Sequence, residues 1–183
     1  MTETDYKIVE TKILFNSPRI QITQDTVEHN GQRRPWFCLQ GPNDAIACLA
    51  LTDDGQIVLT RQYRHGVRDV IVDLPGGVVD QGETPKQAAA RELREETGYR
   101  ASRVELLCRY VPFPGYLRVA MNIFLATGLL PGPQNLDEGE ELEVILLPAA
   151  EVLQMVLRGE IVDSSLQIAI LLAAQKGLIR SGK

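Results

Sequence analysis

The sequence has no surplus of positive charge. It contains 19 lysines and arginines against 24 aspartates and glutamates, which gives a formal net charge of -5. Proteins that bind nucleic acids without sequence preference rely on a basic surface, so the composition argues against a nucleic-acid partner. It does not exclude a small anionic substrate, because a bound metal ion can supply positive charge locally.

Long apolar runs are also missing. The segment "LQIAILLAAQKGLI" is shorter than the ~20 residues that a membrane-spanning helix needs, and it is typical of a core helix instead. The N-terminal stretch "MTETDYKIVE" is acidic and polar, so we expect no signal peptide there. We therefore expect a cytoplasmic protein with no membrane partner.

Cysteine is scarce as well. Cys38, Cys48 and Cys108 are widely spaced, odd in number and form no CxxC pair. Cys48 and Cys108 lie in apolar runs, which favours buried and reduced thiols.

The 183 residues are enough for one domain with a substantial core and a small appendage. The N-terminal part shows partial alternation of apolar and polar residues, and "HNGQ" offers the Asn-Gly pair of a tight hairpin. We therefore predict an N-terminal antiparallel β segment over residues 1–42, followed by the main domain over residues 43–183.

The main domain combines strands with helices. After the helix described next come three more predicted strands and two C-terminal helices, and Asp163 to Ser165 are candidate N-caps of the last helix. This order predicts an α/β fold in which a mixed sheet lies between helices. The predicted strands cover residues 45–52, 56–63, 103–111, 121–130 and 142–148.

One predicted helix has well-marked ends. Thr84 is a suitable N-cap, Pro85 fits the first helical position, and Gln87 completes a capping-box pattern. Gly98 supplies a left-handed residue after the last turn. The sequence therefore predicts a helix over residues 85–97.

This helix gathers negative charge on one face. Glu92, Glu95 and Glu96 are neighbours at helical spacing, where like charges repel by about 0.2–0.5 kcal/mol per pair. A solvated acidic stripe is the simplest interpretation. However, the stripe is compact and follows the glycine-rich loop "DLPGGVVDQGE", and hard divalent cations prefer several carboxylate oxygens. We therefore predict a metal-binding helix.

The same residues resemble a family signature, the Nudix box. Its glycines, arginine and glutamates are all present at the expected spacing, and only Tyr99 departs, where an aliphatic residue is usual. The resemblance implies an α/β/α sandwich with a mixed sheet. It also implies hydrolysis of a nucleoside diphosphate linked to another moiety, with Mg²⁺ or Mn²⁺ as cofactor. The matching positions are Gly77, Glu83, Arg91, Glu92, Leu93, Glu95, Glu96 and Gly98.

The resemblance implies a set of metal ligands. Glu92 and Glu96 would be the principal ligands, Glu95 would be an additional ligand, and Gly76 would offer its backbone carbonyl. A pyrophosphate is strongly anionic, so attack by water requires its charge to be neutralised. A metal ion does this and lowers the pKa of bound water.

Two further box residues would support the site. By the same resemblance, Arg91 holds the carboxylates in place by ion pairing, and Glu83 supports the arrangement of the loop and the helix. With Glu95, they belong to the catalytic set that the resemblance implies.

The flanking sequence resembles the ADP-ribose and nucleotide-sugar pyrophosphatases within this family. "RQYRHGVRDVIVDLPGG" resembles their segment before the box, and Pro114 stands where they commonly carry proline. Asp73 replaces their usual glutamate, and Val119 replaces a frequent acidic residue. The resemblance implies hydrolysis of ADP-ribose or related nucleoside diphosphate sugars to a nucleoside monophosphate and a sugar phosphate. It also implies a homodimer, since the N-terminal segment of this group often exchanges between subunits.

The group also carries a glutamate on a loop before the last strand, where it orients or deprotonates the attacking water. Here "DEGEELEV" offers Glu138, Glu140, Glu141 and Glu143. Register with the following strand favours Glu140, and Glu141 is next. The alternative is a solvated acidic loop.

The remaining candidates are substrate-binding residues. Arg64 and Arg68 are candidates to pair with phosphates or a terminal sugar, although exposed arginines are usually just solvated. Tyr116 and Arg118 follow the Pro-Gly dipeptide and are candidates to line the substrate pocket, as is Asp73.

Two alternative functions remain open from the sequence. One is a noncatalytic nucleotide-binding sensor of Nudix fold, but such domains typically lose one or more box carboxylates, and all are present here. The other is an enzyme of the same fold that acts on other nucleoside diphosphate derivatives, nucleoside triphosphates or capped RNA. The acidic composition argues against long RNA.

Overall fold

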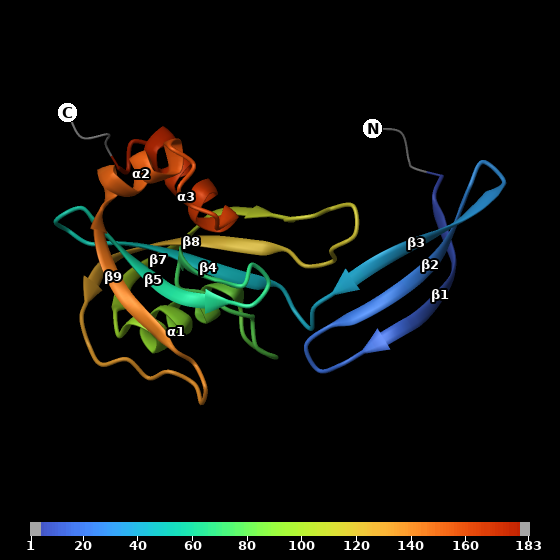
Figure 1. Cartoon of the computed structure of the whole chain (residues 1–183), viewed down its shortest axis with the longest axis horizontal. Helices are drawn as coiled ribbons and strands as arrows, with labels where there is room; N and C mark the ends of the chain where they lie inside the picture. The colour runs from blue at the N-terminus through green and yellow to red at the C-terminus, as the bar shows by residue number, and fades with distance from the viewer. Residues whose placement is uncertain (1–4, 180–183) are drawn as a thin grey trace. The chain divides into compact units, whose positions relative to one another are not determined.

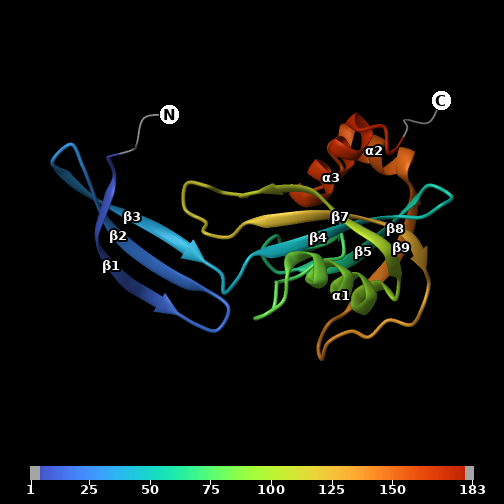
Figure 2. The same ribbon diagram turned by 180° about the vertical axis from the view of Figure 1, so that it is seen from behind.

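The computed structural model describes residues 5–179, which form two compact units (Figures 1 and 2). The first unit contains the described residues up to Asp44 together with Val111–Ala120. The second unit contains Ala45–Tyr110 and the described residues from Met121 onward. The domain boundary predicted from the sequence lies between residues 42 and 43, which leaves the segment 111–120 in the main domain.

The first unit is a three-stranded antiparallel sheet in the order β1-β2-β3. Asn30 and Gly31 both have positive φ angles, 49° and 71°, which suits a two-residue hairpin between β2 and β3. The segment 111–120 is joined to this sheet because the Leu39 N–H donates to the Tyr116 carbonyl at 2.7 Å. The N-terminal antiparallel β segment is therefore confirmed. Its strands are β1 (Lys7–Asn16), β2 (Gln21–His29) and β3 (Gln32–Gln40).

The second unit is built on a mixed sheet. Strands follow the order β6-β5-β4-β8-β7, and β9 pairs with β5. β4 and β8 run parallel, whereas the other neighbours are antiparallel. The strands are β4 (Ala45–Leu51), β5 (Gln56–Arg64), β6 (Asp69–Asp73), β7 (Arg100–Tyr110), β8 (Met121–Leu130) and β9 (Leu142–Pro148).

Three helices cover the two faces of this sheet, which confirms the α/β/α sandwich. One helix lies on one face and two pack on the other (Figure 1). Among the described residues, no helix is long and apolar enough to cross a membrane. The helices are α1 (Pro85–Thr97), α2 (Ala149–Leu157) and α3 (Ser164–Gln175).

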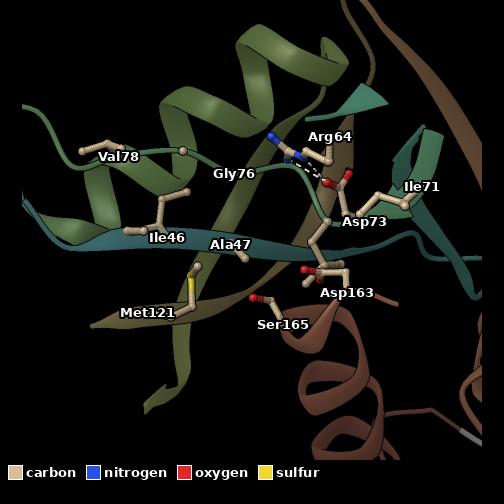
Figure 3. A pocket seen from close by; sticks show the side chains of 13 residues that line it. Ile46, Ala47, Arg64, Ile71, Asp73, Gly76, Val78, Met121, Asp163 and Ser165 are labelled. Carbon is tan, nitrogen blue, oxygen red and sulfur yellow. Dashed lines mark hydrogen bonds and ion pairs between the residues drawn. The ribbon is translucent and has the colours of Figure 1, made fainter. Parts of the chain in front are cut away.

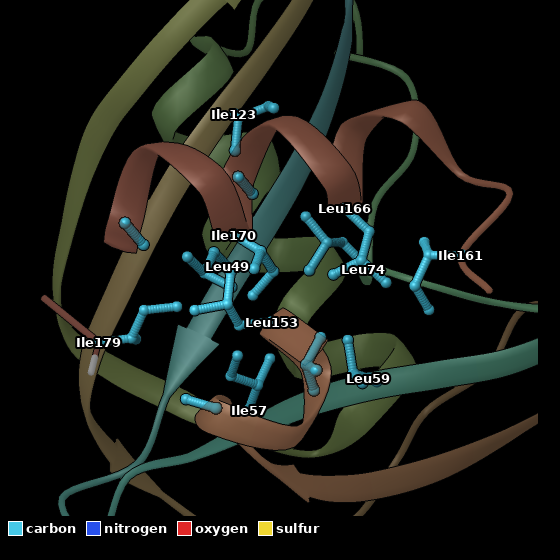
Figure 4. Close-up of a cluster of buried hydrophobic side chains, with 14 of the residues drawn as sticks. Leu49, Ile57, Leu59, Leu74, Ile123, Leu153, Ile161, Leu166, Ile170 and Ile179 are labelled. Atoms are coloured by element: carbon cyan, nitrogen blue, oxygen red, sulfur yellow. The ribbon is translucent and has the colours of Figure 1, made fainter. Parts of the chain in front are cut away.

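Strand β4 contributes to two apolar cores at once. Ile46 and Cys48 face the core beneath α1, whereas Leu49 belongs to the core beneath α2 and α3 (Figure 4). Successive side chains of a strand point to opposite faces, so a strand covered on both faces is apolar throughout. This explains the uninterrupted run "AIACLAL".

Strand β6 is the strand that the sequence analysis did not predict. It is only five residues long, and a turn joins it to β5, in which the Arg68 N–H donates to the Arg64 carbonyl at 2.9 Å. Its last residue, Asp73, leads directly into the glycine-rich loop. β6 therefore sets where that loop begins.

Candidate active site

The ends of α1 are fixed by local hydrogen bonds. The Thr84 side chain accepts from the Gln87 N–H, and the Gln87 side chain accepts from the Thr84 N–H, which completes the predicted capping box. At the other end Gly98 has a φ angle of 78°, and its N–H donates to the Arg94 carbonyl at 2.8 Å. The helix therefore begins and ends at the predicted residues.

The loop before α1 is fastened to strand β4. The carbonyls of Pro75 and Gly77 each accept a backbone hydrogen bond from β4 at 2.8 Å. In antiparallel pairing, the residue between them directs both its N–H and its carbonyl away from the partner strand. The Gly76 N–H accordingly donates to a carboxylate oxygen of Glu96 at 2.8 Å. The Gly76 carbonyl, a predicted metal ligand, faces away from β4 as well.

Close packing explains why this loop carries two glycines. A Cβ atom at Gly76 would collide with the Ile46 carbonyl, and a Cβ atom at Gly77 would collide with the Glu92 carboxylate. The Glu92 side chain therefore occupies a space that exists because residue 77 has no side chain. The conformation of the glycine-rich loop and the position of the Glu92 carboxylate on α1 therefore depend on each other.

The two principal carboxylates of α1 are removed from water. Glu96 is 4% exposed, and its burial raises the pKa of this carboxyl to about 8, against the opposing effect of the Gly76 N–H. Burial also raises the pKa of Glu92, although the Arg91 guanidinium lowers it. Because desolvation and mutual repulsion disfavour the ionised form of both carboxylates, a bound cation would stabilise both of them.

Arg91 connects the helix to the loop before it. Its guanidinium donates to both oxygens of Glu83, at 3.1 and 3.0 Å, and to the Val78 carbonyl at 3.2 Å. It also donates to Glu92 at 2.8 Å and to Glu95 at 3.2 Å. The hydrogen bond from Arg91 lowers the pKa of Glu83. The structure therefore brings four residues of the predicted catalytic and metal sets into direct contact.

The carboxylate cluster of α1, formed by Glu92, Glu95 and Glu96, has the chemistry that a hard divalent cation prefers. Glu92 accepts from Arg91 through one oxygen, and Glu96 accepts a backbone N–H through one oxygen, which leaves each carboxylate a second oxygen for a cation. Glu95 instead engages both oxygens, with Arg91 and with Arg94 at 2.6 Å. Between residues 5 and 179, no three acidic, histidine or cysteine side chains converge as a complete metal site. Glu92 and Glu96 are therefore better placed than Glu95 to hold a metal.

The loop between β8 and β9 is tied to the last turn of α1. The Asn135 N–H donates to the Glu95 carbonyl at 2.9 Å, and the Gln134 side chain donates to the Glu96 carbonyl at 2.6 Å. These bonds hold the first half of the loop beside the acidic helix.

The second half of that loop carries Glu140. Its N–H donates to the Asp137 carbonyl at 3.1 Å, and its carboxylate accepts the Asp137 N–H at 3.1 Å. The charge of Glu140 contributes to the raised pKa of Glu92, so the two side chains share one electrostatic environment. Glu143 is instead engaged with Arg61 at 3.0 Å.

A cavity of about 370 Å³ adjoins the carboxylate cluster, because Gly76 and Gly77 form part of its wall (Figure 3). Arg64 and Asp73 lie on the same wall, joined by an ion pair of 2.6 Å. Asp73 is 4% exposed and also accepts the Thr60 hydroxyl at 2.5 Å. Asp73 therefore restrains Arg64 beside the cavity.

Two polar residues of this cavity, Asp163 and Ser165, were not predicted from the sequence as site residues. They were identified only as candidate helix caps. Asp163 is indeed the N-cap of α3, with its carboxylate accepting the Leu166 N–H at 2.7 Å. Polar residues at the start of an apolar helix are expected for capping alone, so the sequence carried no signal that they line a cavity.

The other predicted substrate-binding residues are not among the residues that line the cavity. Arg68 is exposed in the turn between β5 and β6, with a φ angle of 56°. Tyr116 and Arg118 belong to the first unit. There Arg118 forms an ion pair with the buried Asp25, and the Tyr116 ring stacks on Phe113 with centroids 5.5 Å apart.

Comparison with known proteins gives consistent matches. The model of the NUDIX domain matches residues 41–165. The "ADP-ribose pyrophosphatase" of Bacillus subtilis (strain 168) is 32% identical over 173 residues, which cover 93% of each chain. The "Methanol dehydrogenase activator" of Bacillus methanolicus is 34% identical over 167 residues, 90% of each chain. A crystal structure of an ADP compounds hydrolase matches with a TM-score of 0.86 and 25% identity, over 97% of this chain and 98% of that one.

Proposed function

The chain belongs to the Nudix family of hydrolases that act on pyrophosphate bonds, and we propose that it hydrolyses ADP-ribose or a related nucleoside diphosphate sugar. Its products are a nucleoside monophosphate and a sugar phosphate. One observation carries the proposal: the carboxylates of α1, held by Arg91 and by the Gly76 N–H, adjoin a cavity of about 370 Å³ that contains a restrained arginine. Relatives named ADP-ribose pyrophosphatase support the substrate class.

A divalent cation, Mg²⁺ or Mn²⁺, fits the carboxylate cluster. In this proposal Glu92 and Glu96 are its principal ligands, and Glu95 and the Gly76 carbonyl are additional ones. When bound, the cation neutralises the charge of the pyrophosphate and lowers the pKa of a water molecule. The chain holds the ligands in place beforehand, since Arg91 restrains Glu92 and Glu95.

Glu140 is the proposed general base. It orients the attacking water and takes its proton. The bonds of Asn135 and Gln134 to the last turn of α1 keep the loop near the carboxylates. Within the described part of the chain, the Glu140 carboxylate is hydrogen-bonded only to the Asp137 N–H of its own turn. Glu140 can exchange that contact for water without disturbing the anchored part of the loop.

Arg64 is the proposed phosphate contact in the cavity. Asp73 accepts from Nε and Nη2 of Arg64, at 2.8 and 2.6 Å, so the remaining N–H groups of the guanidinium are available to an anion. Arg68, Tyr116 and Arg118 remain further candidates for substrate binding.

A second copy of the chain is the proposed partner of the N-terminal sheet. Ile8, Ile13 and Phe15 of β1 and Trp36 and Phe37 of β3 are each at least 48% exposed. The strand register places Ile8, Ile13 and Trp36 on one face of the sheet and Phe15 and Phe37 on the other. Several large apolar side chains exposed on one small sheet mark an interaction site. A homodimer that covers this sheet would bury them.

A panel of nucleotide sugars tests the proposed function. The purified protein is incubated with ADP-ribose, other nucleoside diphosphate sugars, nucleoside triphosphates and capped RNA, with and without Mg²⁺, and products are identified by mass. We expect a nucleoside monophosphate and a sugar phosphate, formed only with the metal. Isotopically labelled water then locates the phosphorus that is attacked. Binding of ADP-ribose without turnover under any metal would instead favour a nucleotide-binding sensor.

A further inference from the structure

The cavity beside the carboxylate cluster has a polar side and an aliphatic side (Figure 3). The polar side carries one cation and two carboxylates, from Arg64, Asp73 and Asp163. Among the described residues, no aromatic side chain lines the cavity. A nucleobase would therefore find no ring on which to stack, whereas a sugar needs hydrogen-bond partners and tolerates aliphatic neighbours. The aliphatic side is formed by Ala45, Ile46, Ala47, Ile71, Leu74, Val78 and Met121.

Asp163 lines this cavity with an acceptor group, its carboxylate. One carboxylate oxygen accepts the Leu166 N–H at 2.7 Å and caps α3. Burial raises the pKa of Asp163, and the backbone N–H groups of Leu166 and Ser165 lower it. The charge of Asp73 raises this pKa further and that of Arg64 lowers it, and both residues line the same cavity as Asp163. An ionised carboxylate has no donor and about four acceptor positions, so it keeps acceptor capacity for a hydroxyl of a ligand and repels a phosphate.

The start of α3 is also held firmly. The Ser165 hydroxyl is within 2.9 Å of the Tyr110 hydroxyl, and Ser165 is 5% exposed. Together with the capping bond of Asp163, this contact fixes the first turn of α3 against the sheet. Asp163 therefore occupies a defined position at the cavity wall and has little freedom to turn away.

We propose that Asp163 is a specificity-determining residue that accepts a hydrogen bond from a hydroxyl of the sugar on the far side of the pyrophosphate. The inference rests on the proposed function. A substrate whose pyrophosphate lies at the carboxylates of α1 can extend along Gly76 and Gly77 into this cavity, since both glycines line it. Arg64 then faces the phosphate, and Asp163 faces the sugar.

The substitution Asp163→Asn separates this role from helix capping. Asparagine is as good an N-cap as aspartate, so its oxygen keeps the Leu166 N–H and its amide NH₂ takes the place of the other carboxylate oxygen. A donor then replaces the acceptor that the sugar hydroxyl needs. We expect the thermal midpoint to stay unchanged. Asp163→Ser, which also caps well but is too short to reach the sugar, is the second variant.

The experiment compares two substrates that differ only beyond the pyrophosphate, ADP-ribose and the methyl ester of ADP, which has no sugar there. For Asp163→Asn and Asp163→Ser we expect kcat/KM for ADP-ribose to fall by about tenfold to a hundredfold, mainly through KM. The methyl ester should be cleaved as by the unaltered protein. Glu160→Gln is the matched control, because Glu160 is an exposed carboxylate that pairs with Arg158. It should behave as the unaltered protein with both substrates.

Other results would overturn the inference. Equal losses on both substrates would mean that Asp163 acts on the whole site and reads no sugar hydroxyl. Full activity of both Asp163 variants on ADP-ribose would mean that the residue only caps α3. Failure of the unaltered protein to hydrolyse ADP-ribose and every other nucleoside diphosphate sugar of the panel would refute the proposed function itself, and the inference with it.

Discussion

At the scale of single residues, Arg91 organises the acidic helix. A guanidinium carries five N–H groups, and this one reaches Glu83, Glu92, Glu95 and a backbone carbonyl. Three carboxylates that would repel one another in isolation are thereby held at short range. Glu96 is held differently, by a backbone N–H, in a place where its charge is poorly solvated.

The substitution Glu96→Gln should separate stability from catalysis. The amide removes a buried charge and keeps the shape, so we expect the thermal midpoint without metal at pH 8 to rise. Turnover should fall by about a hundredfold or more, because mutation of a residue that only supports a metal ligand already lowers metal affinity or activity by about ten- to a hundredfold. Calorimetry and an ADP-ribose assay measure both. Glu151→Gln, at an exposed position of α2, is the control and should change neither. Full Mg²⁺-dependent activity of Glu96→Gln would contradict its role as a ligand.

The pKa of Glu96 also predicts how stability varies with pH. The carboxyl has an ordinary pKa of 4.5, and in the folded protein it is about 8. Between these values the folded state retains a proton that the unfolded state has released, so the free energy of unfolding falls as pH rises through this window. Added Mg²⁺ should stabilise the protein most at the alkaline end, since it requires the ionised carboxylate.

Thermal melts from pH 4.5 to 8, with and without Mg²⁺, test this dependence. The Glu96→Gln variant is the reference, because it lacks the titrating group. If its midpoint fell over the window as steeply as that of the unaltered protein, Glu96 would not be the source of the effect.

At the scale of elements, the glycine-rich loop and α1 depend on each other. Gly77→Ala would place a Cβ atom against the Glu92 carboxylate and displace it. Misplacement of a catalytic group by about 1 Å can cost about a hundredfold, so we expect kcat/KM to fall by about that factor. The matched control is Gly66→Ala, in the turn between β5 and β6, where a Cβ atom meets nothing within 4 Å. Normal activity of Gly77→Ala would show that Glu92 moves aside without consequence.

The N-cap of α1 makes a separate prediction. Thr84→Ala removes the side-chain oxygen that accepts the Gln87 N–H. The free energy of unfolding should fall by about 1 kcal/mol, measured by urea titration. Lys86→Ala, at a neighbouring exposed position, serves as the control. A loss no larger than that of the control would mean that the capping box contributes little here.

Much of this architecture could be predicted from the sequence because its signals are local. Thr84, Pro85, Gln87 and Gly98 fixed the limits of α1 by rules that act within one helical turn, and the strands β8 and β9 have the predicted bounds. The ion pairing of Arg91 with carboxylates of α1 was expected from the family resemblance.

The cavity could not be predicted in the same way. Asp73 and Asp163 are far apart in the sequence, and only the packing of α3 against the sheet brings them to one wall. Strand β6 was missed because a five-residue run carries little periodicity. The bond between Leu39 and Tyr116, which assigns the segment 111–120 to the first unit, is likewise a long-range contact between backbone groups.

At the scale of the whole molecule, two units of different character share one chain. The second unit has two apolar cores, one on each face of its sheet. The first unit is a three-stranded sheet on which β1 is exposed along its entire length. A sheet of this size with so many exposed apolar side chains is more stable when a partner covers it.

The proposed dimer can therefore be tested on β1. The double substitution Ile13→Glu and Phe15→Glu places charges among its exposed apolar side chains. We expect a dimer for the unaltered protein and a monomer for the variant, measured by light scattering over a range of concentrations. Lys12→Gln changes a polar residue of the same strand and should remain dimeric. A monomeric unaltered protein, or a dimeric variant, would count against this interface.

The backbone hydrogen bonds between the glycine-rich loop and β4 determine which segments must be moved together if this site is grafted onto another protein. Residues 76–97 carry the carboxylates and Arg91, but the position of Gly76 depends on backbone bonds that β4 donates to Pro75 and Gly77. A graft of the loop and helix alone would contain the charged side chains, but it would lack the strand that positions the Gly76 N–H for its hydrogen bond to Glu96. The smallest transferable catalytic module therefore includes strand β4, although that strand contributes no side chain to the carboxylate cluster.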